Sequence, residues 1–517
     1  IKLNSSNSGS IILDGQDVTI SDYFLIQNGV FQIKSGSFTS TQNTSSTTIN
    51  SGFNINGGML DIDGGTVSFG LVTSTTADLN VNGGIVDVSA GVLNVSDELD
   101  VVSGTLSQTG GTINIRNYSG SAEGSAEPKF EMLAGSLNLI NGTLNILGQN
   151  SNVGNYSILV ASAVSVNSTA NHTINIATNN SASDEDRHID LGGNSIGNLT
   201  FDQLGHELYL TNNLSISGGL TVTAGTFDIQ ANSVNVSGST SNDGVLKIGL
   251  GTLDAEGDYD ATNGFTTFYD QGRMQLAGTA VSFGVMTTTF GTVEYDGGNQ
   301  DVLADTYFNL EIDGSGTKTL PPNSFTINGD LSLSSGTLTY NSSANKSMSV
   351  KGSILGTGNI TSTVANILNL NGNGTLQSLR GVSSDFIGIR FSGAANVITT
   401  GNLSCKYLDL MPGSTGSFTI DGETVSLNPT NGYLQLDGGN LIVSSGSLIN
   451  NSTSQTNNYV NSGTLTVSGG TVEMTGNNGA SGTGGDLNVN GGAILVSSGI
   501  LSINDELDVA NGIITQT

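Results

Sequence analysis

Glycine recurs at a seven-residue step through much of this 517-residue chain, and the segments between the glycines alternate apolar and polar residues. In SGTLTVSGGTVEM, Leu465 and Val467 fall on one face and Thr464 and Thr466 on the other, which is the period of a β-strand. The sequence therefore predicts a repeating unit of one strand of about five residues followed by a corner that needs glycine. The bracketing pairs are Gly58 and Gly65, Gly84 and Gly91, Gly135 and Gly142, Gly439 and Gly446, and Gly492 and Gly499.

Two architectures can be built from such a unit. Asn-Gly between alternating runs is typical of an antiparallel hairpin, and many hairpins would make a string of β-sandwich domains. The rival is a parallel solenoid, which we favour because polar inserts such as GLVTSTTA (70–77) extend a corner and leave the pattern on either side intact. We predict an all-β, elongated, right-handed parallel β-helix (β-solenoid) with corner inserts, about 20 residues and three short strands per coil.

A second, much longer repeat overlies the first. DLNVNGG stands at 78–84 and again at 486–492, and the match extends without a gap over 78–109 and 486–517. We interpret the chain as a window on a longer tandem array with a period of about 408 residues, because chance explains poorly an ungapped match that shares both DLNVNGG and DELDV. The alternative is a complete protein whose ends stack head-to-tail into a filament. The predicted divisions, expected to form one continuous rod, are the first copy 1–109, the unique remainder 110–407 and the second copy 408–517.

The composition limits the class of partner. Charged residues make up only 11% of the chain, yet the net charge is -30, which argues against binding to nucleic acid or to anionic membranes. No apolar run approaches the length of a transmembrane helix, so we expect no membrane insertion of this segment. The single cysteine, Cys405, excludes a disulfide framework and a cysteine zinc site, and we expect it to be a buried, inert thiol.

Motifs for catalysis are missing from the sequence. The three histidines, His172, His188 and His206, have no partner at metal-ligand spacing, and no HExxH, GxSxG or phosphate-loop motif occurs. We therefore predict no catalytic residues, no enzymatic activity and no organic cofactor.

Two acidic segments are candidates for Ca²⁺, because that ion is bound by several carboxylate oxygens. They are SASDEDRHID and LDAEGDYD, and a solvated corner insert is the interpretation that we favour for both. The candidate ligands are Asp184, Glu185 and Asp186 in the first segment, and Asp258 and Asp260, beside Asp254 and Glu256, in the second.

Aromatic residues on flat faces are candidates for stacking against sugars. Tyr295, Tyr307 and Phe308 are the residues concerned, although packing in the core or at corners is the interpretation that we favour.

The middle of the chain carries a family resemblance. The order of strands in residues 291–340 begins GTVEYDGGNQDV, continues through YFNLEI and ends in FTINGDLSLSSGTLTY, and 190–227 is a weaker copy. This order resembles the β-strand-repeat segments of giant cell-surface proteins and adhesins of Bacteroidota, including type IX secretion cargo. The SGTLTVSGGTVEM units are similar to repeats of autotransporter passengers and filamentous-haemagglutinin-like adhesins.

The resemblance implies an extracellular location on a bacterial cell surface. We therefore expect a non-enzymatic structural repeat region of a fibre or adhesin. Its expected partners are other copies of itself, through lateral or end-to-end assembly into fibres, and surface glycans. The alternative is a polysaccharide-binding or polysaccharide-degrading β-helix protein, which a carboxylate-lined groove on one face would favour.

Overall fold

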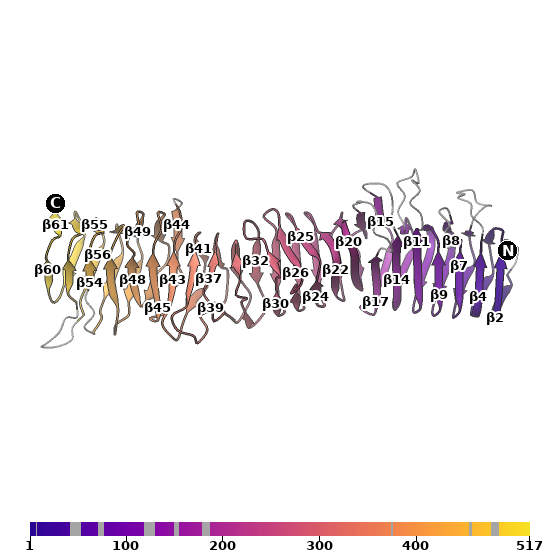
Figure 1. Cartoon of the computed structure of the whole chain (residues 1–517), viewed down its shortest axis with the longest axis horizontal. Coiled ribbons are helices and arrows are strands. Elements are labelled where there is room, and N and C mark those ends of the chain that lie inside the picture. The colour runs from indigo at the N-terminus through magenta and orange to yellow at the C-terminus, as the bar shows by residue number, and fades with distance from the viewer. Residues whose placement is uncertain are drawn as a thin grey trace. The chain divides into compact units, whose positions relative to one another are not determined.

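The computed structural model is made of short parallel strands (Figure 1). It divides into two compact units, Ile1–Met286 and Thr287–Thr517, which we call the N-terminal and C-terminal units. No helix occurs in the described part of the chain. The described residues are 1–6, 8–41, 53–70, 77–117, 130–148, 155–177, 187–373, 376–453, 458–476 and 485–517.

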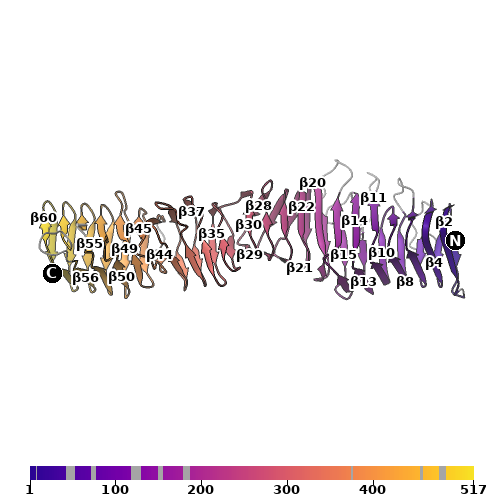
Figure 2. The same cartoon turned by 90° about the horizontal axis from the view of Figure 1, so that it is seen from below.

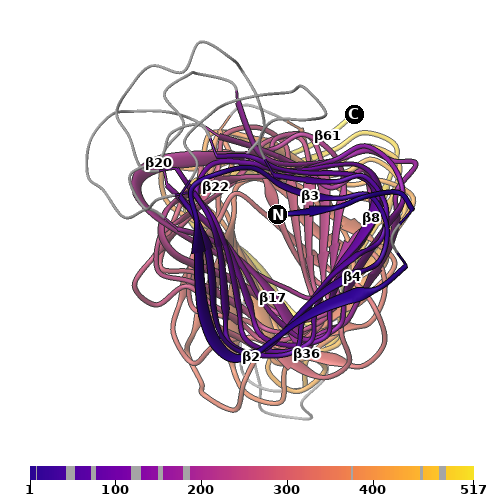
Figure 3. The ribbon, with the colours of Figure 1, turned by 90° about the vertical axis from the view of Figure 1, so that its right-hand side faces the viewer.

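Strands of the N-terminal unit stack in parallel on strands about one turn away in the sequence. Strand β10 (Leu99–Gln108) pairs with β8 (Leu79–Val88), so that Leu79 lies beside Leu99 and Val86 beside Leu106. On its other edge β10 pairs with β12 (Phe130–Met132) and β13 (Ser136–Leu139). In Figure 3 the indigo and purple strands of this unit lie behind one another around a common interior. This parallel stacking is the predicted solenoid and excludes the antiparallel hairpins of the rival architecture.

From residue 387 to the end of the C-terminal unit, successive strands are distributed among three parallel sheets (Figure 2). After three strands the chain returns to the first sheet and adds one strand to each in the same order. The first such set is β45 (Ile387–Phe391), β46 (Asn396–Thr399) and β47 (Leu403–Cys405), followed by β48 (Tyr407–Leu410), β49 (Ser417–Ile420) and β50 (Thr424–Leu427).

The core follows directly from the alternation in the sequence. In β55 (Thr464–Val467) the side chains of Leu465 and Val467 are fully buried, whereas Thr464 and Thr466 face outward and are half-buried. The interior is mainly apolar. In the first turns, for example, the Phe31 and Phe38 rings lie 5.0 Å apart, centroid to centroid. Burial of such a row on every turn is the main favourable contribution to folding.

The seven-residue glycine step corresponds to two columns of stacked glycines. Gly91 adopts a left-handed φ of +76°, and a Cβ at this position would lie 2.5 Å from the carbonyl oxygen of Gly65 on the neighbouring turn. Only glycine allows this conformation together with this close approach of backbones. In the N-terminal unit one column contains Gly65, Gly91, Gly111 and Gly142, and the other contains Gly58, Gly84, Gly104 and Gly135.

Candidate functional site

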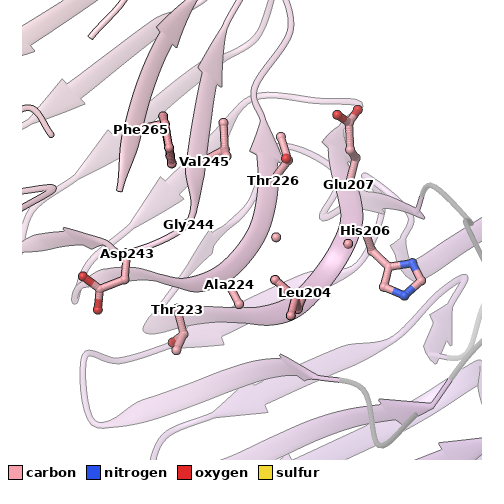
Figure 4. Close-up of a pocket in the computed structure, with 12 residues that line it drawn as sticks. Leu204, His206, Glu207, Thr223, Ala224, Thr226, Asp243, Gly244, Val245 and Phe265 are labelled. Atoms are coloured by element: carbon pink, nitrogen blue, oxygen red, sulfur yellow. The ribbon is translucent and has the colours of Figure 1, made fainter. Parts of the chain in front are cut away.

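A surface groove of about 470 Å³ lies on the N-terminal unit, where four successive turns change direction (Figure 4). Each turn contributes the end of one strand, a corner and the start of the next strand. The strands that border it are β20 (Asn198–Leu210), β22 (Leu220–Asp228), β24 (Thr240–Asn242), β25 (Val245–Ile248) and β28 (Phe265–Phe268).

The floor of the groove is glycine backbone. Gly205, Gly225 and Gly244 occupy the corners of three successive turns. A Cβ on Gly225 would lie 2.2 Å from the carbonyl oxygen of Gln203, and one on Gly244 would lie 2.6 Å from that of Gly225. No side chain can therefore stand at Gly225 or Gly244, and Gly205 has a left-handed φ of +83° that disfavours a side chain there. The side chains on either side of these glycines leave a hollow between them.

One wall changes from acidic to apolar along the stack. Strand register places Glu207 beside Thr226, Thr226 beside Val245, and Val245 beside Phe265. Figure 4 shows these four side chains in a row, all on the same side of the groove. Phe265 is 47% exposed.

The opposite wall is formed by residues that precede the glycines. Leu204, Thr223 and Asp243 lie along it (Figure 4). Leu204 is 83% exposed, an unusual position for a large aliphatic side chain. The carboxylate of Asp243 accepts a hydrogen bond of 3.1 Å from the side-chain amide of Asn263.

The second acidic residue of the groove is already engaged. Glu207 accepts hydrogen bonds from the ammonium group of Lys247 and from the hydroxyl of Tyr209. Burial raises the pKa of Glu207, but these hydrogen bonds and the charge of Lys247 outweigh it, and the pKa is lowered overall. Glu207 is therefore an ionised, paired carboxylate.

His206 borders the groove, but its imidazole does not point into it. Its side chain is buried, and Figure 4 shows the imidazole directed away from the space between the two walls. His172 is buried in the interior, where its Nε2 lies 2.9 Å from Oε1 of Gln108. His188 lies between the rings of Tyr156 and Tyr209, at centroid distances of 5.6 and 5.4 Å. The structure thus places the three histidines at separate positions.

Of the two acidic segments proposed for Ca²⁺, only the second lies wholly within the described residues. Asp184, Glu185 and Asp186 lie outside the described residues. The carboxylate of Asp258 accepts a hydrogen bond from the backbone N–H of Thr279, and that of Asp260 accepts one from Thr262. Within the described ranges, no group of three or more His, Cys, Asp or Glu side chains is arranged to hold a metal ion. Binding of Ca²⁺ by these residues stays a prediction.

Two of the three aromatic candidates for sugar stacking are packed inside the protein. Tyr295 and Tyr307 are fully buried, with their hydroxyl oxygens 3.2 Å apart, so they cannot contact a ligand at the surface. Phe308 is half-buried beside Phe290, with their ring centroids 6.5 Å apart. The surface stacking role is therefore wrong for both tyrosines, and the packing interpretation is correct.

A polar and aromatic cluster lies on three adjacent strands of the C-terminal unit, β45, β48 and β51 (Tyr433–Leu436). The rings of Tyr407 and Tyr433 stack at 4.7 Å, and the guanidinium of Arg390 lies 5.8 Å from the Tyr407 centroid. Nε of Arg390 is 3.3 Å from Oδ2 of Asp409. Because these groups contact one another, the cluster stabilises the sheet surface and leaves little free to bind a ligand.

Sequence reasoning did not find the groove, although a signal was present. Glycines at 205, 225, 244, 264 and 284 recur at steps of 19 or 20 residues, and a side chain from each following strand forms the wall. A scan of the family models, the curated proteins and the solved structures gave no match to this chain.

No helix among the described residues is long and apolar enough to cross a membrane.

Proposed function

We propose that this chain is a non-enzymatic structural repeat region of an extracellular fibre or adhesin on a bacterial cell surface. The observation that carries the proposal is that each unit is a parallel β-solenoid in which every turn is held by the turns beside it. Such a fold gains length by repetition, because each added turn contacts only its neighbours. Reach from a surface is the property that a fibre or adhesin stalk needs.

We further propose that the coils are right-handed, with about 20 residues and three short strands in a regular coil. The pairing of Leu79 with Leu99 and the rotation of strands among three sheets support the coil length and strand number. Parallel strands joined by a crossover in one sheet almost always make a right-handed connection, which supports the handedness.

The long repeat supports the resemblance to giant surface proteins of Bacteroidota and a role in a tandem array. In the first copy Leu79 pairs with Leu99 and Val81 with Val101. In the second copy, β57 (Leu487–Val489) pairs with β60 (Leu507–Val509) in the same register, Leu487 beside Leu507. Matching register in the two copies is the behaviour of one structural unit used twice. Self-association into fibres, laterally or end to end, is part of this proposal.

The alternative function is the degradation of polysaccharides, and the groove with its two carboxylates, Glu207 and Asp243, is the place to consider it. A glycosidase acid must hold its proton near neutral pH, which requires a raised pKa. Glu207 is instead paired with Lys247 and has a lowered pKa. This argues for a groove that binds rather than cleaves.

The proposed location can be tested on intact cells of the source organism. Antibodies raised against residues 1–517 should label unpermeabilised cells, and the label should disappear when the surface is treated with protease. Antibodies against a cytoplasmic marker should label only permeabilised cells. Labelling by the first antibody only after permeabilisation would overturn the proposal.

A further inference from the structure

We propose that the groove between Leu204 and Phe265 binds a segment of a neutral oligosaccharide. The proposal names an adhesive partner and rests on the surface function for its biological meaning. Binding itself depends only on the geometry of the N-terminal unit, so the two can fail separately.

The apolar part of the groove continues beyond the hollow. Val285, in β31 (Val285–Met286), pairs with Phe265 and is 62% exposed. Val245, which is half-buried, and the exposed Phe265 and Val285 thus form an apolar stripe on three successive turns. Leu204 lies on the opposite wall at the other end of the groove, near Glu207 (Figure 4). Exposed apolar patches with a polar rim mark interaction sites on soluble proteins.

The polar groups beside the stripe suit hydroxyl groups as partners. Thr223 and Asp243 line the hollow on one wall and Thr226 lines it on the other (Figure 4). A sugar ring has an apolar C–H face and a rim of hydroxyl groups. An aromatic face with hydroxyl and carboxylate acceptors beside it complements both parts of that ring.

The charge of the groove disfavours anionic ligands. Its lining includes Glu207 and Asp243 but no lysine or arginine. Lys247, on the same strand as Val245, is bound to Glu207. In a chain of net charge -30, this arrangement repels acidic polysaccharides, phosphates and nucleic acid.

Addition of a peptide strand is disfavoured because the backbone of the floor is already bonded. The N–H groups of Asp243 and Gly244 donate to the carbonyl of Val222 at 2.8 and 3.1 Å. The carbonyl of Gly244 accepts from the N–H of Phe265 at 2.8 Å. A peptide that binds by strand addition needs free groups of this kind. A ligand in this groove must therefore be recognised by side chains, and a neutral sugar can be bound in that way.

The test is saturation-transfer difference NMR on the full chain with defined probes. The neutral probes are hexasaccharides of β-linked glucose, α-linked glucose, xylose, mannose and galactose, and the charged probes are hexagalacturonate and decalysine. We expect at least one neutral hexasaccharide to bind, and Phe265→Ala to weaken its binding by about tenfold or more. Asp243→Asn should weaken it less, because the amide keeps one acceptor.

Phe386→Ala is the matched control. Phe386 is also 47% exposed, but it belongs to the C-terminal unit, whereas all the groove residues belong to the N-terminal unit. It should leave binding unchanged. Amide hydrogen exchange of β25 and β28 reports whether Phe265→Ala keeps the fold.

Three results would overturn the inference. They are no binding of any neutral hexasaccharide, equal binding by the Phe265→Ala variant with an intact fold, and preferential binding of decalysine that Asp243→Asn abolishes. None of them would alter the surface-labelling result. Conversely, if the chain binds a hexasaccharide but is found inside the cell, the proposed location is wrong and the proposed sugar binding still holds.

Discussion

The side-chain amide of Asn145 donates a hydrogen bond of 2.9 Å to the side-chain carbonyl of Asn114 on the adjacent turn. Asn114 in turn donates to Asn94 at 2.9 Å, and Asn175 donates to Asn145 at 3.0 Å. Strand register places these residues directly beside one another on the outer face of the N-terminal unit. The spacing of neighbouring strands matches the reach of an amide, so each inner asparagine both donates and accepts.

Replacing Asn145 by alanine should destabilise this face. The change removes a donor from Asn114 and an acceptor from Asn175, and we expect a loss of about 1–2 kcal/mol in the free energy of unfolding. The urea midpoint of the N-terminal unit should fall. The amides of β14 (Gly142–Gly148) should exchange faster with solvent. Asn171→Ala, at an exposed position nearby, is the control and should change neither quantity.

Replacing Gly91 by alanine should be far more damaging than replacing an open glycine. The added Cβ would lie 2.5 Å from the carbonyl oxygen of Gly65, at a φ of +76° that alanine rarely adopts. We expect a loss of about 2–4 kcal/mol, since both backbone strain and a steric clash oppose folding. Thermal unfolding followed by circular dichroism measures the effect.

Gly9→Ala is the control for the glycine column. A Cβ at Gly9 meets nothing within 4 Å, so this variant should match the parent within about 0.5 kcal/mol. Equal melting temperatures for the two variants would show that the columns of glycine are not needed for stacking.

The solenoid could be predicted from sequence because its signal is periodic. Alternation in segments such as Thr464–Val467 specifies which residues are buried, and the glycine step marks the corners. Strand pairing in a solenoid is between nearest turns, so no long-range topology has to be guessed. The parallel arrangement followed from the same regularity.

The groove could not be predicted in the same way, because it depends on which side of a corner is hollow. Leu204 and Phe265 look like ordinary members of alternating strands in the sequence, but both are exposed and each lies directly beside a corner glycine, Gly205 and Gly264 respectively. Tyr295 and Tyr307 show the converse. They were candidates for the surface, but the phenol hydroxyls bond to each other in the core, and Tyr307 also donates to the carbonyl of Leu303 at 2.8 Å.

His172 should make the N-terminal unit less stable as the pH falls. Burial lowers its pKa from 6.5 to about 4 in the folded protein. Between these values the unfolded chain binds a proton that the folded chain does not, so stability present above pH 6.5 is lost as the pH falls toward 4. We expect a contribution of about 2 kcal/mol between pH 7 and pH 5.

His172→Gln tests this contribution, because glutamine does not titrate and can still bond to Gln108. Urea unfolding of both proteins at pH 7 and pH 5 gives the difference that belongs to His172, since the carboxylates are common to both. An identical pH dependence in the two proteins would contradict a buried, neutral imidazole.

Cys405 should be a silent thiol in the folded protein and a reporter of unfolding. Its side chain is fully buried, and burial, together with the charge of Asp385, raises the pKa of the thiol to about 12. Because the thiolate is the reactive form, iodoacetamide at pH 8 should not label the native chain over hours. Labelling should become fast at the urea concentration that unfolds the C-terminal unit.

A Cys405→Ala chain that carries Ser342→Cys at an exposed position is the control and should be labelled at once without urea. Rapid labelling of Cys405 in the native chain, at a rate close to that of the control, would mean that the strand β47 opens easily and that the stack is loose at this turn.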